Sequence, residues 1–556
     1  MALSELDRKY DAVMAAVTGP GGRVILDKDA EGRTIVANFP STLPLLFKTF
    51  CALYADVEAV ITSGERLTFA ELDRISDRLA RALAACGIGK GDRVGIAMRN
   101  CPAWIVSHMA IVKAGAVATL LNGWWQPDEL EHALQLTEPK LVLADGPRAQ
   151  RIAATCANCT IETIAIEKRC PDAFAGLLAA GSEDIALPDV SPDDDATILF
   201  TSGSTGEAKG AVSTHRAVTT GVYAYSTALM TLRGILESEG RPPPNPLKTL
   251  VVVPLFHVTG EVPVMLNSFV ISRGMVLMPK WDAGEALRLI EREKITYFVG
   301  VPTMSLELMN HPDRDNYDLS TLTDIAAGGA PRPISHVERL RNSFPGAQPA
   351  LGYGLTETNA VGCGNFWDNY AAKPASTGRA QVPFVELAIL GAEDRHLPPC
   401  ERGEIAIRSA ANIKGYWRNA EATAAAFTAD GYLKSGDIGY LDEDGYLFIV
   451  DRKKDIIIRG GENISAVEVE AAIYSCEGIA EAAVIGAPDE RLGEVPVAIL
   501  YRREGSRISE EDLRSFLDGR LAAFKIPARM IFSNDPLPRL GTGKIDRVAL
   551  KQQYAA

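Results

Sequence analysis

The sequence has no long hydrophobic run and little cysteine. Its most apolar stretch, around residues 109–125, is interrupted by Lys113 and several glycines, whereas a membrane-spanning helix needs about 18 consecutive apolar residues. The first residues show no basic segment followed by an apolar one, so we expect no secretory signal and a cytoplasmic protein. Nine scattered cysteines do not suit a disulfide framework, and the close pair Cys156 and Cys159 has no second pair or histidine nearby in sequence to complete a zinc site.

Neither sign of charge forms a long run. The chain carries 57 basic and 71 acidic residues, a net charge of −14, and this balance argues against nucleic acid or an anionic membrane as the main partner. With 556 residues, the chain is too long for one hydrophobic core. Its hydrophobic content of 47% is that of a folded globular protein. We therefore expect a protein of several packed domains.

Helical and strand patterns alternate through the first two-thirds of the chain. A capping box at Thr68 and Glu71 opens a helix whose leucines recur at helical spacing until Gly87 ends it. Proline-rich residues 241–246 predict an exposed loop. The other predicted helices are 3–17, 104–114, 129–136 and 285–293, and the predicted strands are 93–98, 116–121, 141–144, 250–254, 297–300 and 322–327. Such alternation predicts largely parallel sheets covered by helices.

The pattern changes twice in the last third of the chain. After Gly378, short strands alternate with turns such as Asp430-Gly431, which predicts a small antiparallel sheet or barrel over about 379–451. After a charged run at 451–454, two helices and two strands predict a separate α+β unit. We therefore predict an α/β fold with domains 1–451 and 452–556. The first would contain two α/β subdomains and the barrel, and the second would be small and mobile.

A loop rich in glycine and hydroxyl groups, residues 201–210 (TSGSTGEAKG), lies between two apolar runs and predicts a turn between strands. Its glycines let the backbone approach a ligand closely, while its hydroxyls and lysine supply donors and a positive charge. Such a loop suits a polyphosphate. It is not a Walker A loop, because Lys209 stands between Ala208 and Gly210. A polar surface hairpin without a ligand is the alternative interpretation.

Three further stretches have residues suited to nucleotide chemistry. In residues 352–358 (GYGLTET), glycines flank Tyr353, whose ring suits a flat base, and Glu357 offers an oxygen to Mg²⁺. Asp437, beside two glycines, suits a ribose diol. Lys544, on a glycine-flanked loop near the C-terminus, is a positive charge that a second domain can deliver into a cleft. Read singly, each stretch is also consistent with an ordinary turn or an exposed tail.

Together these stretches resemble the adenylate-forming superfamily of acyl-CoA synthetases, nonribosomal peptide adenylation domains and luciferases. Eight segments match in order and spacing from about residue 45 to 550: TSGSTGEAKG, PLFHVTG, GGAP, YGLTET, GEIAIR, SGDIGY, DRKKDIIIRGGENIS and PRLGTGKID. One segment would be a weak signal, but the ordered set is specific. The chain departs from the superfamily pattern at Ala208, where proline is usual, and in the proline-rich insertion near Arg241.

The resemblance implies an enzyme in which a carboxylate attacks the α-phosphate of Mg·ATP, giving an acyl-adenylate and pyrophosphate, after which the thiol of coenzyme A displaces AMP. It implies that Lys544 bridges the carboxylate and the α-phosphate, that Thr356 contacts the α-phosphate and that Glu357 holds Mg²⁺. The C-terminal domain would rotate about a hinge at Lys454 for thiol transfer. The implied nucleotide-binding residues are Thr201, Ser202, Gly203, Ser204, Thr205, Gly206, Lys209, Gly329, Ala330, Pro331, Tyr353, Asp437 and Arg452. The implied CoA-binding residues are Gly460, Gly461 and Glu462.

The identity of the acid is less well defined. We expect His257, at the end of an apolar strand, to position the acyl group, in preference to a buried histidine of purely structural role. The other candidate acyl-pocket residues are small or apolar: Val258, Gly260, Val301, Gly328 and Gly362. Such a lining suits a medium- or long-chain fatty acid, with an aryl or steroid-side-chain acid as the alternative. Three further points stay open. The acyl group could be loaded onto a carrier protein in place of coenzyme A, and the chain could be a nucleotide-binding scaffold without catalysis. The oligomeric state is also open, with a homodimer as one option.

Overall fold

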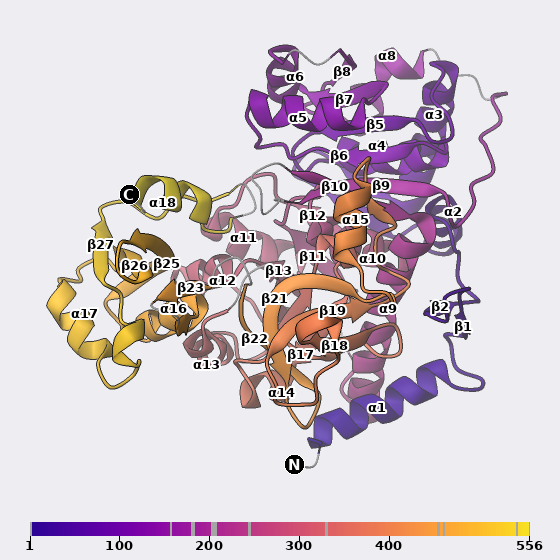
Figure 1. The fold of residues 1–556 in the computed structure, drawn as a ribbon. Helices are drawn as coiled ribbons and strands as arrows, with labels where there is room; N and C mark the ends of the chain where they lie inside the picture. Colours follow the sequence, from indigo (N-terminus) through magenta and orange to yellow (C-terminus); the bar gives the residue numbers. More distant parts are fainter. Residues whose placement is uncertain are drawn as a thin grey trace.

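The computed structural model describes residues 3–155, 158–179, 184–201, 208–242, 246–328, 332–452, 456–459, 462–540 and 543–554. Within these residues the chain forms helices and sheets in three regions (Figure 1). The helices α1 (Glu5–Thr18) and α2 (Leu43–Leu53) precede the first region, and α1 packs against the long helix α9 (His215–Ser238). None of the described helices is long and apolar enough to cross a membrane.

The first sheet has the strand order β20-β10-β9-β6-β5-β7-β8. Its strands are β5 (Arg93–Ala97), β6 (Val117–Leu120), β7 (Leu141–Asp145), β8 (Thr160–Ile164), β9 (Asp195–Thr201), β10 (Lys209–Thr214) and β20 (Gly415–Tyr416). The strands β6, β5, β7 and β8 run parallel, as the alternating pattern predicts. Its helices are α3 (Phe69–Ala85), α4 (Pro102–Lys113), α5 (Pro127–Thr137) and α6 (Gly146–Ala153). The capping box predicted at Thr68 and Glu71 is present at the start of α3.

The second sheet has the order β18-β19-β21-β22-β17-β16-β15-β14-β13-β11-β12-β3-β4. Its parallel part contains β3 (Glu58–Ile61), β11 (Lys248–Val251), β12 (Gly274–Leu277), β13 (Tyr297–Gly300), β14 (Asp324–Ala327) and β15 (Gln348–Gly354). The helices α11 (Ala283–Glu293), α12 (Pro302–Asn310), α13 (Ile334–Ser343) and α14 (Trp367–Ala372) follow its strands. One hydrophobic core joins the two sheets through α4, which is buried along its whole length.

The barrel predicted over 379–451 is not a separate closed barrel in the described part of the chain. Its strands, β18 (Glu386–Leu390), β19 (Gly403–Arg408), β21 (Leu433–Leu441) and β22 (Tyr446–Arg452), extend the second sheet through β17 (Gly378–Ala380) and β16 (Gly362–Phe366). Gly378 makes this continuity possible: it adopts a φ of 100°, and a Cβ there would lie 2.0 Å from the Gly364 carbonyl oxygen. Because only glycine fits so close to β16, the antiparallel strands join the large sheet and do not close on themselves.

The third region is the predicted C-terminal α+β unit. Its sheet has the order β24-β23-β26-β25, with β27 paired to β26. Its strands are β23 (Ile457–Arg459), β24 (Glu462–Ile464), β25 (Ile479–Asp489), β26 (Gly493–Arg502) and β27 (Arg529–Ser533), and its helices are α16 (Ala466–Tyr474), α17 (Glu510–Leu517) and α18 (Arg547–Tyr554). It has a hydrophobic core of its own, formed by buried residues such as Ile457, Val469, Leu500, Leu513 and Met530. In Figure 1 this region, in yellow, lies beside α12 and α13. The predicted hinge residue, Lys454, lies outside the described residues.

Candidate active site

The two strands that bracket the predicted phosphate loop place its first and last functional groups opposite each other. Strands β9 and β10 are antiparallel, and Thr201 is the direct pairing partner of Lys209. The two strands on either side of the loop are therefore antiparallel neighbours, and a hydroxyl and an ammonium stand opposite each other at their ends. Most of the predicted loop residues, Ser202, Gly203, Ser204, Thr205 and Gly206, lie outside the described part of the chain.

The Lys209 side chain is connected to Glu357 through an aromatic ring. Its Nζ lies 5.2 Å from the centre of the Tyr416 ring, and the Tyr416 hydroxyl donates a hydrogen bond of 2.8 Å to Glu357 Oε1. Burial raises the pKa of Glu357, while the bond from Tyr416 and the charges of Arg452 and Lys209 act in the opposite direction. This arrangement provides one half-buried carboxylate whose charge is influenced by a nearby ammonium. A hard divalent cation that arrives with phosphate ligands needs such an oxygen.

Residues 356–358 form a short 3-10 helix (η3), which positions Thr356 and Glu357 side by side. The backbone N–H of Leu355 is capped by the Thr358 hydroxyl at 3.0 Å. The preceding Gly354 packs tightly, because an added Cβ would lie 2.0 Å from the Ala360 carbonyl oxygen. Thr356 and Glu357 both line the main cavity of the molecule. The turn is thus fixed by backbone packing, and its two functional side chains are left to face the cavity.

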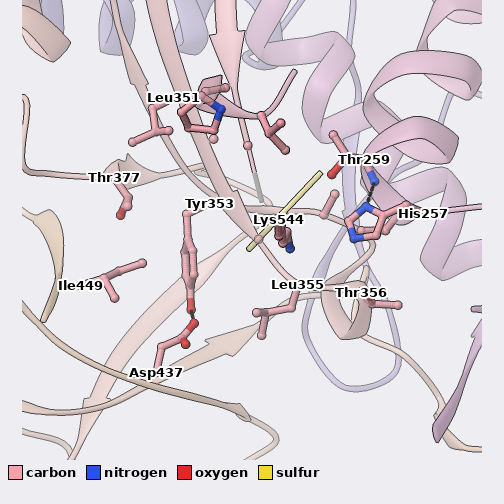
Figure 2. A pocket seen from close by; sticks show the side chains of 18 of the residues that line it. His257, Thr259, Leu351, Tyr353, Leu355, Thr356, Thr377, Asp437, Ile449 and Lys544 are labelled. Atoms are coloured by element: carbon pink, nitrogen blue, oxygen red, sulfur yellow. Dashed lines mark hydrogen bonds between the residues drawn. The ribbon is translucent and has the colours of Figure 1, made fainter. Parts of the chain in front are cut away.

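Tyr353, Asp437 and Arg452 form a second polar group. Asp437 on β21 and Arg452 on β22 are direct antiparallel partners, and Arg452 Nε lies 3.1 Å from Asp437 Oδ1. The Tyr353 hydroxyl donates a 2.7 Å hydrogen bond to Asp437 Oδ2, as Figure 2 shows. The carboxylate is 4% exposed, so its acceptor positions are directed by these neighbours. An aromatic ring and a carboxylate held together in this way suit a nucleoside.

The C-terminal region places Lys544 in the same cavity. Figure 2 shows Lys544 between Tyr353 and His257. Burial and the nearby Arg452 lower the pKa of Lys544 to about 8, and Asp437 acts in the opposite direction. Its neighbour Gly543 adopts a φ of 81° and faces Val301, 3.1 Å from where a Cβ would stand. The Lys544 ammonium is therefore surrounded by residues of the other regions, as expected of a charge that a second domain delivers.

His257 is half-buried, and its imidazole is neutral. Burial, with a further contribution from Lys544, lowers its pKa to about 3. The Thr259 backbone N–H donates to His257 Nδ1 at 3.3 Å. A neutral imidazole that accepts at Nδ1 carries its proton on Nε2. His257 lines the cavity, and it can therefore act there as a hydrogen-bond donor and not as a cation.

One cavity of about 2700 Å³ connects these groups. Of the predicted acyl-pocket residues, His257, Val258, Val301 and Gly328 line it. Gly260 and Gly362 do not, which corrects the prediction. A Cβ on Gly260 would lie 2.1 Å from the Pro254 carbonyl oxygen, and one on Gly362 would lie 2.5 Å from that of Tyr353, so both glycines are needed for packing behind the cavity wall.

The structure does not show every predicted residue at the site. Glu462 is exposed at the start of β24 and does not line the cavity. The predicted residues Gly329, Ala330, Pro331, Gly460 and Gly461 lie outside the described residues. No contact to nucleotide or to coenzyme A is therefore assigned to these six residues.

Sequence reasoning missed three groups that the structure brings to the cavity. Tyr416 carries the hydroxyl that orients Glu357, although 59 positions separate the two residues. Arg273 and Tyr297 also line the cavity. Tyr297 begins a predicted strand, but no sequence pattern indicates that the Arg273 guanidinium lies over its ring. These contacts arise from strand pairing and loop packing, which no local pattern encodes.

The paired strand ends at Thr201 and Lys209, the Tyr353–Asp437–Arg452 group and Lys544 of the C-terminal region around one cavity are the arrangement expected of an adenylate-forming enzyme. Comparison with known proteins agrees. Residues 47–417 match the family described as AMP-binding enzyme, and residues 468–544 match the AMP-binding enzyme C-terminal domain. The chain belongs to the AMP-binding enzyme family, and it is an ATP-dependent acid–thiol ligase of the acyl-CoA synthetase class.

Two curated relatives and one solved structure illustrate the similarity. A long-chain-fatty-acid–CoA ligase of Bacillus subtilis is 32% identical, with 93% of this chain and 96% of that protein covered. A feruloyl-CoA synthase of Amycolatopsis is 36% identical, with 89% and 96% covered. The crystal structure of ATP-bound MatB from Rhodopseudomonas palustris aligns with a TM-score of 0.80 at 29% identity and covers 92% of this chain and 99% of that one.

Proposed function

We propose that this ligase converts a hydrophobic carboxylic acid, of the medium- or long-chain fatty-acid class, into its CoA thioester. The observation that carries the proposal is the meeting of Lys544 with Asp437 and His257 in one cavity, because these side chains come from separate regions of the chain. A relative that acts on long-chain fatty acids supports the acid class. A relative that acts on a feruloyl group supports an aryl acid as the alternative.

In the first half-reaction, an oxygen of the carboxylate forms a bond to the α-phosphorus of ATP, and the bond to pyrophosphate breaks. Lys209 and Thr201, facing each other at the base of the loop, would hold the outgoing phosphates. Thr356 would donate to the α-phosphate, and the Lys544 ammonium would neutralise the charge that develops between the two reactants. The neutral His257, a donor at Nε2, would orient the acid. Asp437 would accept from the ribose hydroxyls, with Arg452 holding it in place.

Glu357 would hold Mg²⁺ together with the ATP phosphates, and the ion would supply charge neutralisation on those phosphates. The half-buried Glu357 carboxylate fits this role, since Tyr416 donates one hydrogen bond to Oε1 and its neutral phenol cannot itself neutralise the charge. The Lys209 ammonium, which lies over the Tyr416 ring, favours the ionised form of the Glu357 carboxylate.

In the second half-reaction, the thiol sulfur attacks the acyl carbon, the carbon–oxygen bond to AMP breaks, and the thiol proton is lost. The C-terminal domain would rotate about Lys454, which withdraws Lys544 and brings Glu462, with Gly460 and Gly461, to the thiol channel. The exposed position of Glu462 in the present arrangement is consistent with a role in a second arrangement only. Coenzyme A is the thiol that the relatives' activities support.

The test is an assay of both half-reactions with purified protein, Mg·ATP and a panel of aliphatic, cinnamic, benzoic and steroid-side-chain acids. We expect pyrophosphate release with a subset of the acids and AMP formation that requires coenzyme A. Pyrophosphate release without any response to coenzyme A would identify a carrier protein as the acceptor. The absence of pyrophosphate release and of acyl-adenylate with every acid would contradict the proposal.

A further inference from the structure

The floor of the acyl cavity is formed by one face of neighbouring strands of the second sheet. On β13 this face carries Tyr297 and Val299, and Val301 follows just beyond the strand. Alternate residues of a strand point to the same face, so these three side chains form one row. Val301 contacts the Gly543 loop beside Lys544 and marks the reacting end. Tyr297, four residues away, lies about 13 Å deeper, since a strand rises about 3.3 Å per residue.

The strand β14 continues the floor with the same order of positions. Parallel pairing places Asp324 beside Tyr297, and Ala326 beside Val299. Gly328, Ala326, Ala350 and Gly352 also line the cavity, so its middle is formed by small residues. The floor is thus apolar and lined by small residues next to the reacting end. At the deep end, the side chains of Tyr297 and Asp324 place oxygen atoms on it. A substrate with a purely hydrocarbon tail would not need polar side chains at the deep end.

The Arg273 guanidinium forms part of the cavity wall at the deep end, over the Tyr297 ring. Arg273 is 2% exposed, and its charged group lies 4.9 Å from the centre of the Tyr297 ring. Its Nε donates to the Ser268 hydroxyl at 3.0 Å, and its Nη2 donates to the Pro263 and Val264 carbonyl oxygens at 2.9 and 3.0 Å. Among the described residues, no carboxylate lies within ion-pair distance of this guanidinium. Its charge is held by backbone carbonyls of the π-helix η1 (Gly260–Leu266) and by one ring.

The two oxygen-bearing side chains at the deep end differ in the hydrogen bonds that they already make. Asp324 accepts from the Trp367 indole N–H at 3.0 Å and from the Thr323 hydroxyl at 2.8 Å. For the Tyr297 hydroxyl, no hydrogen-bond partner is found within the described residues, although burial raises its pKa to about 12. A methyl group placed against this half-buried phenol would exclude water from its hydroxyl and leave it without a partner, which costs free energy. An oxygen atom placed there would satisfy it.

Resting on the proposed function, we propose that the acid taken by this ligase carries a hydrogen-bonding oxygen, a hydroxyl or a carbonyl, at the far end of its hydrophobic part. The Tyr297 hydroxyl is the group that binds this oxygen, and Arg273 and Asp324 set the polarity around it. The cavity is therefore selective for a polar-ended acid over a plain alkyl acid of the same length. Tyr297 is a specificity-determining residue and takes no part in either chemical step.

The experiment compares matched pairs that differ by one oxygen: cinnamic with p-hydroxycinnamic acid, and decanoic acid with its ω-hydroxy and ω-oxo derivatives. The kcat/KM for pyrophosphate release is measured for each acid. In parallel, calorimetry gives the Kd of the corresponding acyl-sulfamoyl-adenosines, which mimic the adenylate and bind without turnover. The variant is Tyr297→Phe. The matched control is Tyr223→Phe, which removes a buried hydroxyl that donates to the Pro40 carbonyl oxygen at 2.5 Å, away from the cavity.

We expect the wild-type protein to prefer the oxygen-bearing member of at least one pair by about tenfold or more, because a site built to hydrogen-bond rejects the analogue that lacks the partner. Tyr297→Phe should remove most of this preference, by lowering kcat/KM for the oxygen-bearing acid and raising it for the plain acid, whose methyl end no longer leaves a hydroxyl unpaired. Tyr223→Phe should keep the preference. A preference for the plain acid in every pair, or equal effects of Tyr297→Phe on both members, would overturn the inference. If no adenosine analogue binds at all, the proposed function itself fails.

Discussion

Lys544 and His257 lie in different regions of the chain, yet the Lys544 charge contributes to the low pKa of the His257 imidazole. The two residues are thus parts of one site only when the C-terminal region is docked as it is here. His257 is neutral in this arrangement and Lys544 is the charged partner. Under the proposed function, the step that needs a charge between acid and phosphate would depend on this docking of the C-terminal region, so variants of Lys544 should separate the two half-reactions.

Replacing Lys544 with alanine should lower the rate of acyl-adenylate formation by about a hundredfold or more, because a preorganised charge at the developing transition state is lost. Thiol transfer from a pre-formed acyl-adenylate should stay within a few-fold of the wild-type rate, since that step uses another domain arrangement. Pyrophosphate exchange and single-turnover CoA acylation measure the two steps. Lys551→Ala, on the exposed face of α18, is the control. Equal losses in both half-reactions would contradict this division of labour.

Acyl-adenylate formation should decline as the pH rises above about 8. Burial and Arg452 place the pKa of Lys544 at about 8, below its ordinary value, so the ammonium loses its proton as the pH passes this point. Because the charged form is the useful one, kcat/KM for pyrophosphate release should fall on the alkaline side with an apparent pKa near 8. The Lys544→Ala variant should lack this limb. A wild-type profile that stays flat to pH 10 would show that the charge of Lys544 is not used.

Removing the Tyr416 hydroxyl should weaken the response to Mg²⁺. Its hydrogen bond to Glu357 favours the ionised carboxylate, so Tyr416→Phe should raise the pKa of Glu357 and let protons compete with the metal ion. We expect the Mg²⁺ concentration for half-maximal activity to rise by roughly tenfold or less, in keeping with one hydrogen bond, and more at acid pH. Titration of activity with Mg²⁺ at fixed ATP measures this shift.

The control for that experiment is Tyr432→Phe. The Tyr432 hydroxyl also donates to a glutamate, Glu386, at 3.3 Å, but on the exposed surface away from the cavity. This variant should leave the Mg²⁺ response unchanged. Identical Mg²⁺ curves for Tyr416→Phe and wild type would show that Glu357 does not hold the ion.

Two neighbouring glycines should respond differently to alanine. A Cβ on Gly352 would meet only the Tyr225 hydroxyl oxygen, at 3.9 Å, and would project into the cavity. Gly352→Ala should therefore keep the thermal stability and raise KM for bulky ring acids more than for thin alkyl acids. A Cβ on Gly354 would lie 2.0 Å from a backbone oxygen, so Gly354→Ala should lose about 1–3 kcal/mol of stability. Calorimetry and an acid panel test both, and equal destabilisation would contradict the assignment of Gly352 to the floor.

The alternation of helices and strands and the segments in fixed order were sufficient to predict the architecture of both large sheets. Local patterns encode such features directly: the capping box predicted at Thr68 and Glu71 forms at the start of α3. The predicted barrel failed because a short strand at Gly378 attaches it to the large sheet. That attachment depends on a backbone approach that only a residue without a Cβ permits, and nothing in the neighbouring sequence indicates it.

For the site, the sequence predicted the residues proposed to carry the chemistry: the loop lysine Lys209, the carboxylates Glu357 and Asp437, and the remote Lys544. Only the tertiary structure decided what these groups face. Strand pairing set Thr201 against Lys209 and Asp437 against Arg452, and packing placed Tyr416 and Arg273 where no periodicity points. The reason is physical: residue type and spacing fix local conformation and reactivity, whereas burial, pKa and the depth of a cavity come from contacts between segments far apart in the chain.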